Sequence, residues 1–192
     1  KVDRNGNAVN AKSKEEYSET ENKVRRVKEV MSSEKKIRFG IIGAGHIGKR
    51  HAEMVRRNPE VELVAMCDIK PKESLGLTDL EEPFFNSVDA MLDSGIEFDV
   101  ISVCTPNGLH AEHTLKALDR KKHVVIEKPM ALNVADCEKI IFKALQVSKQ
   151  IFCVMQNRYS PPSLWIKEVI ESQVIGEIFM VQLNCYWNRD ER

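Results

Sequence analysis

Short apolar runs alternate with helical patterns along the chain from residue 37 onward. Runs rich in β-branched and other apolar residues occur at 37–42, 61–67, 84–85, 100–104, 123–127 and 151–156. Between them, apolar residues recur every three to four positions at 47–57, 88–92, 111–120 and 135–148. Strands that alternate with helices in this way are typical of βαβ units. The pattern predicts an α/β fold built on a doubly wound parallel sheet of the Rossmann type.

The two ends of the chain depart from this pattern. Residues 1–35 carry charges of both signs and few core-forming residues, which predicts a disordered or helical extension outside the core. Residues 36–157 are predicted to form the Rossmann domain. Residues 158–192 read as the beginning of a second α+β domain, with a proline-initiated helix that ends near Gly176 and a strand at 178–188.

The overall charge excludes some classes of partner. The 29 basic and 29 acidic residues cancel, so the chain has no net field to attract nucleic acid or an anionic membrane. No stretch approaches the roughly 20 apolar residues of a membrane span. The five cysteines are scattered, with no spacing typical of a metal site. We therefore expect a cytoplasmic protein with free core thiols, no metal and a small-molecule partner.

Three spaced glycines follow the first strand and open the first helix. Gly43, Gly45 and Gly48 match the pattern G-x-G-x-x-G, with His46 and Ile47 in the first helical turn. In a dinucleotide site the first glycine permits a tight turn, the second lets the backbone approach the pyrophosphate, and the third lets helix and strand pack closely. The free amides of the helix N-terminus then bind the phosphates.

Asp68 ends the next strand, 20 residues after Gly48. A carboxylate at this position accepts hydrogen bonds from the adenosine ribose and repels a 2′-phosphate, which favours NAD over NADP. Lys70, two residues further on, would soften this repulsion. The alternative interpretation is an ordinary glycine turn with an aspartate on the surface.

Two further motifs follow the fourth and fifth predicted strands. Ligands of open α/β sheets bind at the carboxyl ends of the strands, so both motifs are expected in one crevice. The first, CTPNGLH, would pass near the nicotinamide half of the cofactor with Thr105, Pro106, Asn107 and His110. For His110, a histidine at a helix N-terminus without a chemical task is an equal alternative.

The second motif, EKPM, contains the candidate catalytic residue. Lys128 would lie in a partly closed crevice, where desolvation disfavours its charged form, and it could exchange a proton with a substrate hydroxyl. The peptide bond to Pro129 is a candidate cis bond. From spacing alone, a surface lysine is the better interpretation.

Together, GIIGAGHIGKRH, CTPNGLH, EKPM and QNRYSP resemble the glucose-fructose oxidoreductase and inositol dehydrogenase (Gfo/Idh/MocA) family over residues 36–192. The resemblance implies that Lys128 is a catalytic or substrate-orienting residue, that the Lys128–Pro129 bond is cis, and that Glu127 lies close to the nicotinamide ribose. Glu127 and Lys128 are therefore also expected to contact the cofactor. It also implies a homodimer or homotetramer for the full-length protein.

Within that family, the link after Asp68 and the segment from residue 156 resemble enzymes that oxidise the 3-hydroxyl of UDP-N-acetylglucosaminuronic acid for bacterial surface polysaccharides. Asn157 and Arg158 would then contact the substrate, with an interdomain ion pair as the alternative for Arg158. The family's second proton-transfer residue would lie beyond Arg192, so we expect no turnover by this chain alone.

Two other functions stay open at this point. The same chemistry could act on a free sugar or a cyclitol such as inositol, or the protein could bind a dinucleotide without catalysis. Tyr159, Trp165 and Trp187 are interpreted as packing residues and not as sugar platforms.

Overall fold

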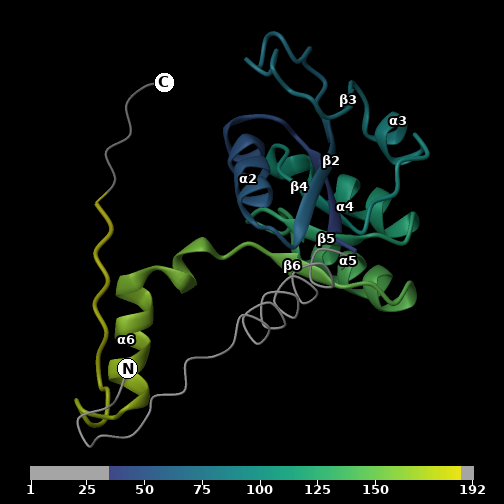
Figure 1. Cartoon of the computed structure of the whole chain (residues 1–192). Coiled ribbons are helices and arrows are strands. Elements are labelled where there is room, and N and C mark those ends of the chain that lie inside the picture. Colours follow the sequence, from purple (N-terminus) through teal and green to yellow (C-terminus); the bar gives the residue numbers. More distant parts are fainter. Residues whose placement is uncertain (1–34, 187–192) are drawn as a thin grey trace, which may run out of the picture.

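The computed structural model describes residues 35–186 and contains a six-stranded sheet in the order β3-β2-β1-β4-β5-β6 (Figure 1). All neighbouring strands are parallel, and the chain winds outward from β1 in both directions. The predicted doubly wound Rossmann sheet is therefore confirmed. The strands are β1 (Ile37–Ile42), β2 (Val61–Cys67), β3 (Phe84–Phe85), β4 (Val100–Val103), β5 (His123–Ile126) and β6 (Ile151–Cys153).

The helices begin and end close to their predicted positions. They are α2 (His46–Arg57), α3 (Val88–Leu92), α4 (His110–Asp119), α5 (Val134–Gln146) and α6 (Pro161–Glu171), with short 3-10 turns η1 (Asn107–Leu109) and η2 (Gln156–Tyr159). Strands β4, β5 and β6 end one to three residues earlier than predicted, so Glu127 and Gln156 lie beyond their strands.

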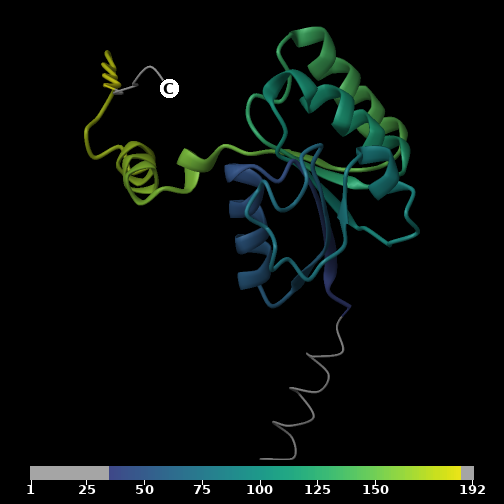
Figure 2. The ribbon, with the colours of Figure 1, turned by 90° about the horizontal axis from the view of Figure 1, so that it is seen from above.

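Successive residues of the central strands serve opposite faces of the sheet. Ile42 packs with buried side chains of α3, α4 and α5, whereas Ile41 packs with α2 and with the loop between β2 and β3. This alternation follows from the two-residue period of a strand. Figure 2 accordingly shows α2 and the pair α4–α5 on opposite sides of the sheet.

The segment after β6 differs from prediction in two respects. Helix α6 ends at Glu171 and not near Gly176, because Gln173 adopts a positive φ of 54° just after the helix. The strand predicted at 178–188 is absent from its described part, residues 178–186, and Phe179 is 88% exposed there. A strand needs a neighbour to pair its main-chain groups, and the described residues provide none for this segment.

Figures 1 and 2 show α6 standing apart from the sheet, joined to it through η2. A domain boundary near residue 157 stays our prediction. The extension predicted at 1–35 and Trp187 lie outside the described residues, except for Lys35.

All five cysteines are free; Cys67 is buried as expected, but Cys185 is exposed. No helix in residues 35–186 has the length and apolar character required to cross a membrane.

Candidate cofactor and active site

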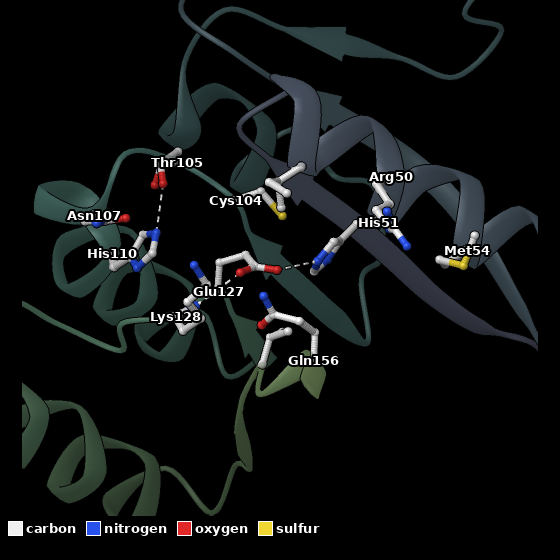
Figure 3. Close-up of a pocket in the computed structure, with 12 residues that line it drawn as sticks. Arg50, His51, Met54, Cys104, Thr105, Asn107, His110, Glu127, Lys128 and Gln156 are labelled. Atoms are coloured by element: carbon white, nitrogen blue, oxygen red, sulfur yellow. Dashed lines mark hydrogen bonds and ion pairs between the residues drawn. The ribbon is translucent and has the colours of Figure 1, made fainter. Parts of the chain in front are cut away.

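A cavity of about 420 Å³ opens at the carboxyl ends of the central strands. It lies next to the point where the strand order reverses, between β1 and β4, where ligands of open α/β sheets bind. Helix α2 forms one wall, and the loops after β4, β5 and β6 form the others (Figure 3). The lining residues are Ile47, Arg50, His51, Met54, Cys104, Thr105, Asn107, His110, Glu127, Lys128, Val154 and Gln156.

The three glycines beside this cavity meet different constraints. Gly43 has a φ of +92°, and a Cβ atom there would lie 2.7 Å from the main-chain carbonyl of Cys104. A Cβ atom on Gly48 would lie 1.8 Å from the carbonyl oxygen of Gly43. The fold itself therefore requires glycine at both positions. At Gly45 a Cβ atom would meet no atom within 4 Å, so only a ligand would compete for that space.

Helix α2 presents a free N-terminus at this turn. Gly45 is its N-cap residue, no side chain caps the helix, and its first turn contains no acidic residue. His46 and Ile47 in that turn are exposed. Main-chain N–H groups at a helix N-terminus carry a partial positive charge, so this end of α2 is suited to an anionic group such as a pyrophosphate.

Asp68 is held beside the same turn. One carboxylate oxygen accepts a hydrogen bond from the main-chain N–H of Ala44 at 2.8 Å, and the other accepts one from the main-chain N–H of Lys70 at 2.9 Å. These contacts fix the carboxylate after the carboxyl end of β2. Because each oxygen has two lone pairs, both can still accept a hydrogen bond from a hydroxyl group of a ligand.

The loop after β4 contributes a neutral thiol and a short turn. Burial raises the pKa of Cys104 to about 12, so its sulfur stays protonated near neutral pH and is a poor nucleophile. Thr105 also lines the cavity, and its hydroxyl lies 3.1 Å from Nδ1 of His113. Pro106 and Asn107 continue into the exposed turn η1, and Asn107 reaches the cavity wall.

His110 joins two loops of the site. It is 1% exposed, with Nδ1 at 2.7 Å from the carbonyl oxygen of Pro129 and Nε2 at 2.8 Å from that of Thr105. Both ring nitrogens therefore face main-chain oxygens, and neither is free toward the cavity. Of the two interpretations left open by the sequence, this geometry favours a residue that holds the loops together.

Glu127 and Lys128 follow directly after β5. The Lys128–Pro129 peptide bond is cis, as the family resemblance implied. Lys128 lines the cavity but is exposed, so the described residues do not provide the desolvation expected from the sequence. Oε1 of Glu127 lies 3.0 Å from Nε2 of His51, and Oε2 accepts a hydrogen bond from the main-chain N–H of Lys128 at 3.2 Å.

Sequence patterns predicted Ile47 in the site but missed the other residues of this wall. Arg50, His51 and Met54 share one face of α2 with Ile47, at the three-to-four spacing that the helix period predicts. The sequence did contain one signal for this wall. His51 is a polar residue next to the buried face of α2, which is otherwise formed by Gly48, Ala52 and Val55.

The expected substrate contacts after β6 do not line the cavity. Asn157 and Arg158 lie in the exposed turn η2, whereas the preceding residue, Gln156, is part of the cavity wall. Tyr159 and Trp165, expected to pack, are 80% and 66% exposed in the described structure.

The fold and this crevice define a dinucleotide-binding protein of the Rossmann class. Residues 37–155 match the GFO_IDH_MocA family, described as an oxidoreductase family with an NAD-binding Rossmann fold. The chain belongs to this family, and the resemblance found in the sequence is confirmed. Its Rossmann domain is of the NAD-binding type, as predicted.

Named relatives include sugar and cyclitol dehydrogenases. The D-glucoside 3-dehydrogenase of Escherichia coli (strain K12) is 32% identical over 147 residues, 75% of this chain and 42% of that protein. The myo-inositol 2-dehydrogenase of Thermotoga maritima is 28% identical over 153 residues, 77% of this chain and 44% of that protein.

A solved structure gives a similar result. The WlbA dehydrogenase from Bordetella pertussis, in complex with NADH and UDP-GlcNAcA, aligns with a TM-score of 0.76 and 32% identity over 81% of this chain and 48% of that one. The chain thus spans less than half the length of each of these three relatives.

Proposed function

We propose that the full-length protein is an NAD-dependent dehydrogenase that oxidises a hydroxyl group of a sugar or sugar nucleotide. The observation that carries this proposal is the position of Lys128, which lines the cavity at the carboxyl ends of the strands. A proton-exchanging group is required there, because oxidation of an alcohol releases a proton as well as a hydride. The names of the relatives support the same reaction class.

The described residues fit NAD on three counts. The open space at Gly45 allows a close approach to the backbone, and the uncapped N-terminus of α2 suits the pyrophosphate. Asp68 would accept hydrogen bonds from the adenosine ribose, and its charge would disfavour a 2′-phosphate. We propose that Thr105, Pro106 and Asn107 adjoin the nicotinamide half of the cofactor.

The reaction assigns distinct tasks to Glu127 and Lys128. Bound NAD supplies the hydride acceptor. Nζ of Lys128 forms a hydrogen bond with the reacting hydroxyl and exchanges its proton as the hydride leaves. Glu127 accepts a hydrogen bond from a hydroxyl group of the nicotinamide ribose. Met54 and Val154 add apolar surface to the cavity.

Within this class we propose the 3-hydroxyl of UDP-N-acetylglucosaminuronic acid, for surface-polysaccharide synthesis in the cytoplasm. The WlbA complex supports this choice, and so does Arg50, a second cation in the cavity wall that has no ion-pair partner among residues 35–186. Asn157 and Arg158 stay proposed substrate contacts, close in sequence to Gln156. Inositol is the alternative substrate, favoured by the relative from Thermotoga maritima.

We also propose that the full-length protein is a homo-oligomer, either a dimer or a tetramer. Helix α5 supports this because Val134, Phe142 and Leu145 are each at least 70% exposed, and apolar surface of this kind commonly marks an interface.

The substrate proposal is tested by mixing the full-length protein with NAD and following nicotinamide absorbance. UDP-N-acetylglucosaminuronic acid and inositol serve as parallel substrates, at protein concentrations that allow a single turnover to be seen. Reduction with the nucleotide sugar alone is expected. Reduction with inositol alone would replace the proposed substrate, and absence of reduction with both would argue against a dehydrogenase of this specificity.

A further inference from the structure

A chain of polar side chains runs between α2 and the strand ends, from buried Ser102 to His51 and Glu127 in the cavity wall. His51 is at its centre, with Nδ1 at 2.7 Å from the hydroxyl oxygen of Ser102 and Nε2 at 3.0 Å from Oε1 of Glu127. Figure 3 shows His51 and Glu127 pointing toward one another across the site. Ser102 is 1% exposed, and the side chains of His51 and Glu127 are 18% and 14% exposed.

The hydrogen-bonding capacities of these groups select one tautomer. A Glu127 carboxylate only accepts hydrogen bonds, so Nε2 of His51 must carry a proton and donate it. In a neutral imidazole Nδ1 then accepts a hydrogen bond, and the hydroxyl group of Ser102 donates it. In a doubly protonated ring Nδ1 would instead donate to the hydroxyl oxygen of Ser102, so Nε2–H is the donor to Glu127 in both forms.

The same contact controls where the Glu127 carboxylate lies. Its second oxygen is held by the main-chain N–H of Lys128 at 3.2 Å, so each carboxylate oxygen has one donor within the protein. Without His51, one oxygen would lose its donor, and the carboxylate could rotate away from the cavity. The side chain of the neighbouring Lys128 would then face a different charge distribution.

We propose that His51 is a positioning residue, which acts on the reaction through Glu127 and not by touching substrate or cofactor. Its Nε2–H group holds the carboxylate toward the cavity, and Ser102 keeps the imidazole in the tautomer that can donate. The inference deepens the proposed function and rests on it for the kinetic part of its test.

Two substitutions separate this role from simple space filling. In His51→Gln the amide nitrogen can replace Nε2 and still donate to Glu127, whereas in His51→Asn the shorter amide can replace only Nδ1. The rate of NAD reduction in a single turnover should fall about 10- to 100-fold in the Asn variant and no more than about threefold in the Gln variant. His123→Asn, at the amino end of β5, is the matched control and should leave the rate unchanged.

Equal losses in the two His51 variants, or a larger loss in the Gln variant, would overturn the proposal, because a structural histidine has no reason to prefer the Nε2 mimic. Thermal unfolding of each variant identifies losses that come from unfolding.

The tautomer supplies a second readout that does not depend on activity. In the full-length protein labelled with ¹⁵N-histidine, the ring signals of His51, assigned by their absence in His51→Gln, should show a protonated Nε2. The opposite tautomer would overturn the positioning contact even if the enzyme is active. If no substrate is reduced, the proposed function fails, and the tautomer still decides whether His51 donates to Glu127.

Discussion

Two substitutions in the glycine turn should affect folding and cofactor binding differently. Gly45→Ala and Gly48→Ala each add one methyl group to the same turn, but the two methyl groups meet different surroundings. At Gly45 the added Cβ atom meets nothing within 4 Å, and the residue has a φ of −68°, which alanine adopts without strain. At Gly48 it would lie 1.8 Å from a main-chain oxygen that cannot rotate away.

The magnitudes follow from these environments. Replacing glycine by alanine at a compatible site stabilises a protein by about 0.4–1 kcal/mol, because the unfolded chain loses freedom. We therefore expect Gly45→Ala to match or slightly exceed the wild type in free energy of unfolding. Gly48→Ala should lose at least about 3 kcal/mol, the upper range for overpacking, because main chain must move.

Cofactor affinity, unlike stability, should fall in the Gly45→Ala variant. A methyl group in the open space would displace a bound pyrophosphate and break at least one hydrogen bond to a charged group, worth about 1.5–3 kcal/mol. The dissociation constant for NADH should rise about 10- to 150-fold.

The assay combines thermal unfolding with NADH titration followed by nicotinamide fluorescence. A Gly45→Ala variant that folds normally and binds NADH like the wild type would refute the claim that the pyrophosphate binds at the glycine turn. A variant that is strongly destabilised would refute the claim that the space beside Gly45 is open.

Three other predictions concern charges and thiols. Asp68→Asn should lower the ratio of NAD to NADP affinity by roughly tenfold, measured by titration, since it removes the charge that repels a 2′-phosphate; an unchanged ratio would contradict this role. At pH 8 iodoacetamide should modify exposed Cys185 at least about tenfold faster than Cys104, whose thiol has a pKa raised to about 12 by burial, and peptide mapping would expose the reverse order. Hydrogen bonds from Arg38 lower the pKa of Asp99 to about 2, so the stability from this pair is present above about pH 4 and is lost as the pH falls toward 2. Asp99→Asn should therefore cost about 1 kcal/mol at pH 7, a figure reduced by solvent screening of a side chain that is 37% exposed. This cost should fall away as the pH drops through about 2; a cost that does not change with pH in acid unfolding experiments would argue against the ion pair.

Local patterns were sufficient for the fold and for the cofactor class. The glycine turn, the strand that precedes it and Asp68 lie within 32 residues of one another, from 37 to 68, and each has a spacing set by backbone geometry. The rule that ligands bind at strand carboxyl ends then brought CTPNGLH and EKPM into one crevice, and Thr105, Asn107 and Lys128 do line one cavity.

Features that depend on distant contacts were not predictable in this way. The partner of His51 is Glu127, 76 residues away, and no local pattern connects them. The exposure of Lys128 depends on which segments cover it in space. The strand predicted at 178–188 had suitable alternation, but a strand also requires a neighbour, and period-two patterning does not provide one.

The role of Lys128 is tested most directly by comparing wild type and Lys128→Ala of the full-length protein in a single turnover with NAD and UDP-N-acetylglucosaminuronic acid. NADH affinity of both proteins is measured alongside. The account predicts a rate reduced about 10²- to 10⁴-fold in Lys128→Ala, with a much smaller change in NADH affinity, because proton exchange is the main task of the lysine. Full activity in Lys128→Ala would contradict the account and leave the cavity without its proposed catalytic group.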